Sequence, residues 1–374
     1  MVDLEQLRVL RRPGPAVTTL LAVAVVAVSV IEMSSSLRPF GFSLAAALTN
    51  GMQTGGVYAL IALGVAIVYR STRVINFAQG ELGTIPAFLV MSILIVVQPG
   101  IGFDQELNSS TVNKGWFIGA VLIAVVFGAI LAMAINLLVV QRLAEASPVT
   151  SLVSTAGITV LFASLEVLVF DARVRTFPRL IEGAPGGFSI GPLCLSQRTT
   201  DGVCDTSQSL AIVNEVVPWN TILIFALLII VSVTLAAFFR SPPGVALLAA
   251  AQEPLAAELY GVSPRAMSTL AWGFAGAFGA LAGVLGAGVF SQIRPGLMTS
   301  DFLVPGLVAA VLGGITSMPG AVAGGLIVGL LASLANAAVL ELDWTVPNPP
   351  QVAIFVALLL VLLFRPRGLL GKDA

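Results

Sequence analysis

Long apolar runs separated by short polar stretches follow one another along the whole chain. A helix needs about 20 apolar residues to cross the hydrocarbon core of a bilayer. The clear candidates are Pro15–Met33, Trp116–Val140, Val149–Phe170, Trp219–Phe239, Ala266–Phe290, Ala321–Leu340 and Gln351–Phe364. Leu44–Tyr69 is long but interrupted by glycines, and Leu82–Val97 and Leu303–Ile315 are short. The pattern predicts an all-α integral membrane protein of about ten transmembrane helices, with discontinuous segments.

Composition agrees with this pattern. The chain is 57% hydrophobic and 10% charged, with a mean hydropathy of +1.01, whereas soluble chains carry roughly 25% charged residues. The net charge of −1 comes with no basic patch, so no nucleic-acid partner is expected.

The distribution of arginines predicts the orientation, because cytoplasmic loops are enriched in Lys and Arg. With ten crossings and a cytoplasmic N-terminus, most basic groups fall inside, including the C-terminal ones, which predicts N-in and C-in. The predicted parts are a cytoplasmic tail (1–14), one membrane domain (15–371) and a C-terminal tail (372–374). Within the membrane domain, 171–218 is an extracytoplasmic loop and 241–265 a cytoplasmic loop.

The chain contains no histidine and two cysteines. The lack of histidine excludes a Ser-His-Asp triad, an HExxH zinc site and His-ligated haem, and no metal site is expected. Cys194 and Cys204 both lie in the predicted outer loop, where a disulfide would form readily. Two free thiols remain the alternative.

Small residues recur at helical spacing in several predicted spans, for example from Gly273 to Gly286 and in the Gly320/Gly324 and Gly325/Gly329 pairs. Helices in lipid associate through close backbone packing at such positions. We expect them to pack helices within this chain. A subunit contact or a pore-lining face is the alternative.

The most informative polar segment is Asn76–Glu81, which lies between two apolar runs. Non-helical backbone at membrane depth is tolerated only where it is buried in protein or lines a wet cavity, and broken helices of this kind build transporter sites. The alternative is an ordinary cytoplasmic turn, in which Asn76 caps a helix and Glu81 complements the dipole of the next helix.

Acids within apolar runs are costly. We expect Glu81 to orient the backbone of Asn76–Gly80; direct contact with a substrate ammonium is the alternative. Glu32 and Glu166 are expected to reach the outer interface by snorkelling.

The stretch from Asn50 to Glu81 resembles the LivH-type permease of branched-chain amino acid ABC importers. That family shows a Gly-x-x-x-Gly-x-x-Tyr-Ala-Leu-x-Ala-Leu-Gly run followed by Asn-Phe-Ala-His-Gly-Glu. The matching residues are Gly51, Tyr58, Ala59, Leu60, Ala62, Leu63, Gly64, Asn76, Phe77, Ala78, Gly80 and Glu81. Gln79 replaces the usual histidine, which puts a proton-sensing role at this position in doubt.

Later segments resemble the same family. Val311–Gly314, Pro319–Ala321 and Leu363–Gly371 are similar to its C-terminal half, so that the resemblance covers most of 50–371. It implies a translocation pathway at Asn76, Phe77, Gln79, Gly80, Glu81, Gly313 and Gly314. The two broken stretches near Asn76–Glu81 and Gly313–Gly320 would suit an inverted-repeat bundle.

The segment Ser241–Val262 resembles the family's cytoplasmic coupling loop. The residues assigned to ATPase coupling are Gly244, Ala251, Gln252, Glu253, Pro254, Leu255, Leu259 and Gly261. We expect a short helix capped by Gly261 that offers Leu255 and Leu259 to a groove on the ATPase. A plain interhelical loop is the alternative.

The chain has no GxxxxGK[ST] phosphate loop, so it is not expected to be an enzyme or to bind a cofactor. The resemblance implies two LivG/LivF-like ATPase subunits, which hold ATP and Mg, and a LivM-like second permease or a second copy of this chain. It also implies an extracytoplasmic solute-binding protein, surrounding membrane lipid, and a location in the bacterial cytoplasmic membrane.

The substrate class implied by the resemblance is branched-chain amino acids or similar small organic solutes. Relatives that carry urea, amides or small aromatic and organic acids are the alternative. An ion-coupled secondary transporter is disfavoured because buried acids are scarce, and a membrane enzyme because no catalytic cluster is present.

Overall fold

The computed structural model describes residues 44–97, 112–143, 147–181, 218–341, 347–365 and 368–371. Its long helices are α2 (Leu44–Thr72), α3 (Glu81–Val97), α4 (Lys114–Leu138), α5 (Pro148–Phe170), α6 (Trp219–Arg240), α9 (Pro264–Phe290), α11 (Met318–Glu341) and α12 (Pro349–Phe364). The shorter elements are η3 (Phe77–Gln79), η4 (Val140–Leu143), β1 (Arg175–Thr176), α7 (Pro242–Gln252), α8 (Pro254–Leu259), β2 (Gln292–Ile293), η6 (Thr299–Leu303) and α10 (Val304–Gly313).

Helix predominates, as the apolar pattern predicts. Among the described residues, seven helices are long and apolar enough to cross a membrane, and Thr299–Gly313 and Pro349–Phe364 form two shorter apolar helices. The predicted span Pro15–Met33, both predicted tails and Glu32 lie outside the described residues. The total of ten spans and the N-in, C-in orientation therefore stay predictions.

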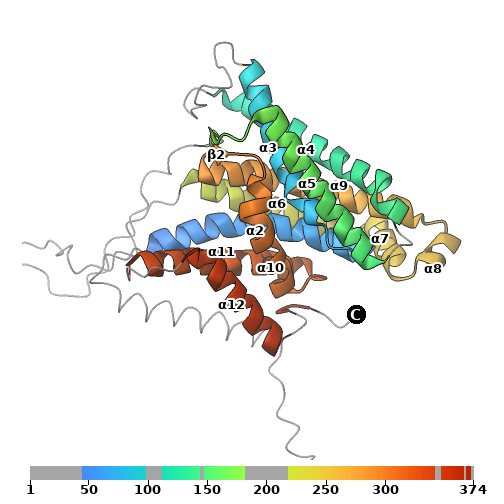
Figure 1. Cartoon of the computed structure of the whole chain (residues 1–374). Helices are drawn as coiled ribbons and strands as arrows, with labels where there is room; N and C mark the ends of the chain where they lie inside the picture. The colour runs from blue at the N-terminus through green and yellow to red at the C-terminus, as the bar shows by residue number, and fades with distance from the viewer. Residues whose placement is uncertain are drawn as a thin grey trace, which may run out of the picture.

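Helix α2 forms the centre of the bundle, and α11 lies against it (Figure 1). From Val57 to Val68 nearly every side chain of α2 is buried. The α2–α11 interface is built on glycines: a Cβ on Gly329 would collide with the backbone of Gly55, and one on Gly325 with that of Ala59. Small residues thus let the two backbones touch.

Helix α9 packs in the same way against α3 and α4. A Cβ on Gly283 would collide with the backbone of Gly83, and one on Gly276 with that of Gly128. The prediction that the glycine rows pack helices within the chain is confirmed at these positions.

The two ends of α9 carry different structures. At its C-terminal end β2 pairs antiparallel with β1, which belongs to the predicted outer loop. At its N-terminal end α7 and α8 extend beyond the bundle (Figure 1). With 27 residues at 1.5 Å each, α9 separates these two ends by about 40 Å. The sequence does not predict the sheet, because two-residue strands leave no periodic signal.

Outward faces of α4, α5, α6 and α12 expose large apolar side chains, such as Leu122, Leu168, Ile229 and Leu363. A soluble protein rarely leaves such faces uncovered. Lipid or another subunit is the expected environment of these helices.

Candidate functional site

A buried polar break joins α2 to α3. Helix α2 ends at Thr72, and the next residue, Arg73, has a left-handed backbone with φ 57°. Asn76 then adopts an extended conformation and caps η3, its side-chain oxygen accepting from the Ala78 amide at 3.0 Å. The side chains of Asn76, Gln79 and Glu81 are all fully buried. This segment is therefore a broken helix inside the protein, although Asn76 is also the cap that the alternative expected.

Side chains tie this break to two other helices. The Gln79 amide nitrogen donates to the Ala275 carbonyl of α9 at 2.9 Å, and the Asn76 amide donates to Gln79 Oε1 at 3.3 Å. The Phe77 amide donates to the Thr155 hydroxyl of α5 at 3.3 Å. Polar groups buried at this depth need such partners, and here they fix the position of η3 between α5 and α9.

Two glycines of the segments that resemble the family make room for this arrangement. A Cβ on Gly64 would occupy the place of the Gln79 amide, and one on Gly80 would collide with Thr299. Gly64, Gln79 and Gly80 all lie in the stretch that resembles the family. Only the fold shows that Gly64 and Gln79 are neighbours.

Two buried acids meet beside the break. Glu81 is fully buried and Glu166 is 3% exposed. One Glu166 oxygen accepts from the Gly296 amide at 2.8 Å. A Cβ on Gly296 would lie 4.0 Å from a Glu81 oxygen. Both acids therefore converge on the Gly296 turn.

Two expectations about these acids are wrong. Glu166 does not snorkel; it points into the bundle, because the Gly296 amide offers a hydrogen bond there. Glu81 does not orient the Asn76–Gly80 backbone, since no hydrogen bond joins its carboxylate to that backbone. The Asn76, Gln79 and Thr155 side chains hold that backbone instead.

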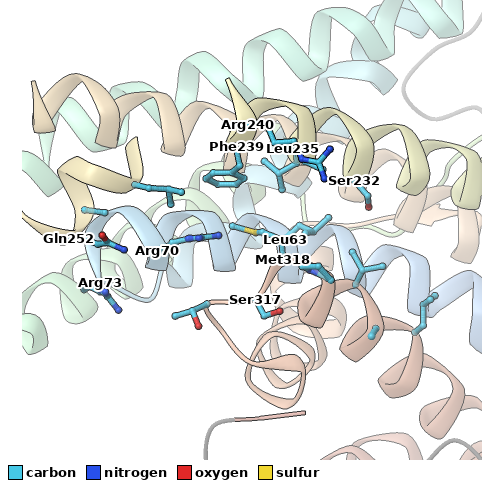
Figure 2. A pocket seen from close by; sticks show the side chains of 18 residues that line it. Leu63, Arg70, Arg73, Ser232, Leu235, Phe239, Arg240, Gln252, Ser317 and Met318 are labelled. Carbon is cyan, nitrogen blue, oxygen red and sulfur yellow. The ribbon is translucent and has the colours of Figure 1, made fainter. Parts of the chain in front are cut away.

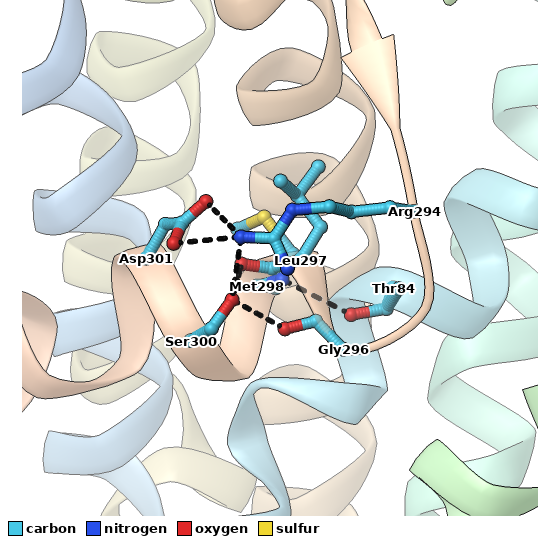
Figure 3. Close-up of polar contacts among 7 residues, drawn as sticks. All are labelled: Thr84, Arg294, Gly296, Leu297, Met298, Ser300 and Asp301. Carbon is cyan, nitrogen blue, oxygen red and sulfur yellow. Dashed lines mark hydrogen bonds and ion pairs between the residues drawn. The ribbon is translucent and has the colours of Figure 1, made fainter. Parts of the chain in front are cut away.

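The turn that carries Gly296 is held by an ion pair (Figure 3). One guanidinium nitrogen of Arg294, Nη2, donates to both Asp301 oxygens, at 3.0 and 2.9 Å, a charge-assisted contact. The Met298 amide also donates to the Thr84 hydroxyl of α3 at 3.2 Å. These contacts place the Gly296 amide where Glu166 accepts from it.

The predicted pathway residues Gly313 and Gly314 lie elsewhere, at the last residue of α10 and in the tight turn that follows it. A Cβ on Gly313 would collide with the Gly320 backbone, and Gly314 has φ 101°. The amides of Leu369 and Leu370 donate to the carbonyls of Leu312 and Gly313 at 2.7 and 3.0 Å. The structure thus places the two glycines in backbone packing, and does not bring them together with Asn76–Glu81.

A cavity of about 1050 Å³ opens between α2, α6, α7 and the start of α11 (Figure 2). Its polar lining includes Arg70, Arg73, Arg240, Gln252 and Ser317; Phe239, Leu63, Leu235 and Leu326 are among the apolar residues. Sequence reasoning used these arginines only for orientation. Their shared cavity was missed, because it is formed by helices remote in the sequence.

The predicted coupling segment folds as two short helices. Gly244 sits where α6 turns into α7, and a Cβ there would collide with the Phe238 backbone. Ala251 and Gln252 end α7 and line the cavity. Glu253 separates the helices, and Pro254 begins α8 at a position where its missing N–H is not needed.

Helix α8 ends in a Schellman motif, as the Gly261 cap predicted. Gly261 has φ 80°, its amide donates to the Glu258 carbonyl at 2.9 Å, and the Val262 amide donates to the Ala257 carbonyl at 2.9 Å. The exposed fractions are 78% for Leu255, 89% for Leu259 and 89% for Tyr260. The predicted short helix with two outward leucines is confirmed.

Metal binding is the next kind of site to consider among the described residues. No group of three or more His, Cys, Asp or Glu residues among the described ones could hold a metal ion. Cys194 and Cys204 lie outside the described residues, so the disulfide stays a prediction.

Comparisons with known proteins agree with the resemblance seen in the sequence. The family model for the branched-chain amino acid transport system permease component matches residues 47–364. The permease protein BraD of Pseudomonas aeruginosa is 30% identical over 331 residues, covering 87% of this chain and 95% of the relative. LivH of Salmonella typhimurium is 30% identical over 329 residues, covering 86% and 94%. LivH of Escherichia coli is 29% identical over 335 residues, with the same coverage.

No solved structure gives a significant match to the chain. The match of the family model nonetheless spans the broken helix, the cavity and the α7–α8 segment. The relatives are aligned over nearly their whole length. The chain therefore belongs to the permease-component family of branched-chain amino acid transport systems.

Proposed function

We propose that this chain is the membrane subunit of a binding-protein-dependent importer that moves branched-chain amino acids or similar small organic solutes across the bacterial cytoplasmic membrane. The names of its relatives support this substrate class. ATP and Mg are held by two separate ATPase subunits, and an extracytoplasmic binding protein delivers the solute. A second permease, or a second copy of this chain, completes the membrane part.

The observation that carries the proposal is helix α8. It lies outside the candidate membrane spans and exposes Leu255, Leu259 and Tyr260 almost completely. A short helix with outward apolar anchors is suited to a groove on a partner protein. The ATPase subunit of an importer is the partner that must contact the permease to drive it.

The α7–α8 connection supports a mechanical role. Gln252 lines the cavity and Leu255 belongs to the exposed face of α8, with only Glu253 and Pro254 between them. A displacement of α8 by a closing ATPase would therefore reach the cavity wall directly. In this proposal the moving elements border the solute pathway. They carry the residues Asn76, Phe77, Gln79, Gly80, Glu81, Gly313 and Gly314.

The test is reconstitution of the chain with its partner subunits in proteoliposomes. Leu255→Ala with Leu259→Ala should lower ATP-driven uptake about tenfold or more, because buried apolar anchors carry most of an interface's binding energy. Leu168→Ala is the matched control: Leu168 is 80% exposed on α5, and its replacement should leave uptake unchanged.

Co-purification separates two ways in which the proposal can fail. If the α8 double variant retains its ATPase subunits and normal uptake, α8 is not the docking element. If the wild-type chain moves solute in liposomes without any ATPase, the importer assignment itself is overturned.

A further inference from the structure

The cavity between α2, α6, α7 and α11 combines cationic groups with an apolar wall. Arg70, Arg73 and Arg240 are among its described lining residues, and no acidic residue is among them. Leu63, Leu235 and Leu326 continue the lining along the helices. The chemistry of the site is therefore that of a receptor for an amphipathic anion.

The three cavity arginines are not paired with acidic side chains of the described residues, unlike Arg294 and Arg173. Arg294 is paired with Asp301, and Arg173 with Asp171. Within the described part of the chain, Arg70, Arg73 and Arg240 form no ion pair. Arg70 instead lies over the Phe239 ring, 4.9 Å from its centre. An anion in the cavity would offset the positive charge of these arginines.

The shape and charge of the cavity distinguish between anions. A branched-chain amino acid is zwitterionic, and the lining offers no carboxylate to pair with its ammonium. It would also leave most of the 1050 Å³ empty. A phospholipid with net negative charge has a phosphate for the arginines and an acyl chain for the leucines. Basic pockets between transmembrane helices are known binding sites for such headgroups.

We propose that this cavity binds an anionic phospholipid, with its phosphate held by Arg70, Arg73 and Arg240 and an acyl chain lying along Leu63, Leu235 and Leu326. Figure 2 labels the three arginines, Leu63, Leu235 and Gln252 among the side chains that line the cavity. Because Ala251 and Gln252 line the same cavity, an occupying lipid also contacts the end of α7. The bound lipid thereby stabilises the C-terminal end of α7, which leads directly into α8.

The experiment measures lipid retention by the purified full chain. The chain is exchanged into nanodiscs of phosphatidylcholine with a small fraction of phosphatidylglycerol, extracted into mild detergent, and analysed by native mass spectrometry. The wild type should retain phosphatidylglycerol in preference to phosphatidylcholine. Arg70→Gln with Arg240→Gln should reduce that preference about tenfold or more, since each Lys or Arg near an anionic surface contributes about 1 kcal/mol.

Two variants make the outcome specific. Arg142→Gln is the matched control: Arg142 lies in η4, is exposed and does not line the cavity, so the preference should survive. Arg70→Lys with Arg240→Lys keeps the charge and should retain most of the preference. Equal retention of the two lipids by the wild type, or an equal loss in Arg142→Gln, overturns the proposal.

Competition with inorganic phosphate distinguishes a phospholipid headgroup from a free phosphate ion as the ligand. Millimolar phosphate should leave retention of phosphatidylglycerol unchanged, because it has no acyl chain for the apolar wall. Displacement of the lipid by phosphate at that concentration would show a site for a soluble anion, and would overturn the lipid assignment. Neither result depends on ATPase subunits, so this test is independent of the proposed import function.

Discussion

At the scale of single residues, identical glycines have different consequences because their surroundings differ. A Cβ on Gly283 would overlap the backbone of Gly83, whereas one on Gly157 would meet nothing within 4 Å. Both residues lie in long apolar helices, and the sequence does not distinguish them. Only the crossing of α9 with α3 decides which of them is needed for packing.

The first prediction compares these two glycines. Gly283→Ala should destabilise the protein by about 1–3 kcal/mol, because the overlapping atom is backbone and cannot rotate away. Gly157→Ala should be neutral or slightly stabilising, since alanine favours the helix. Thermal unfolding in detergent measures both changes. Equal melting temperatures for the two variants would contradict the backbone contact between α3 and α9.

The second prediction concerns two asparagine caps. Asn76→Ala removes the cap of η3 and the partner of Gln79 inside the bundle, and should cost about 1–2 kcal/mol. Asn113→Ala removes the cap of α4, which bonds the Gly115 amide at 2.9 Å on the exposed surface. Water can replace that bond, so a smaller loss is expected.

The same pair of variants tests the pathway proposal. ATP-driven uptake should fall severalfold in Asn76→Ala at a temperature where both variants are folded. Normal uptake in that variant would remove Asn76 from the solute pathway while leaving its structural role intact.

At the scale of elements, the apolar pattern locates helices well because helix length and hydrophobicity are local properties. Trp219–Phe239 is observed as Trp219–Arg240, and Val149–Phe170 as Pro148–Phe170. The Gly261 cap was also predictable, because a Schellman motif is encoded within a few residues. The β1–β2 pair and the Gly296 turn bring together remote segments, so the burial of Glu166 could not be predicted from its own helix.

The third prediction tests the cap of α8. Gly261→Ala places a Cβ on a backbone with φ 80°, at a cost of about 1–2 kcal/mol. The last turn of α8 should loosen, and uptake coupled to ATP should fall with it. Hydrogen exchange at the Gly261 and Val262 amides measures the loosening. Gly119→Ala, a helical position with nothing within 4 Å, should change neither exchange nor uptake.

At the scale of the whole molecule, the structure separates the two ends of the bundle. The short sheet and α8 lie at opposite ends of α9, so the bundle has two chemically distinct ends. The charge pattern predicts which end is cytoplasmic. The cavity could not be predicted from the sequence, because its lining comes from three distant parts of the chain: α2, the consecutive helices α6 and α7, and the start of α11.

The fourth prediction fixes the orientation. Cys194 and Cys204 are first replaced by serine, and single cysteines are then introduced as Tyr260→Cys at the end of α8 and Ala172→Cys after α5. A membrane-impermeant maleimide should label Ala172→Cys in intact cells and Tyr260→Cys only after the cells are opened. The reverse pattern would overturn N-in and C-in together.

The glycine contact between α2 and α11 has a consequence for how such a protein can change shape. Two helices that touch backbone to backbone at Gly55 and Gly329 cannot slide without opening a void, because no rotamer is available to fill it. Helix α6 meets α2 differently, through the Ile224 side chain against Gly56, and a side chain can adapt as its helix shifts. Between inward-open and outward-open states, α2 and α11 should therefore travel as one body, and the sliding surface should lie along α6.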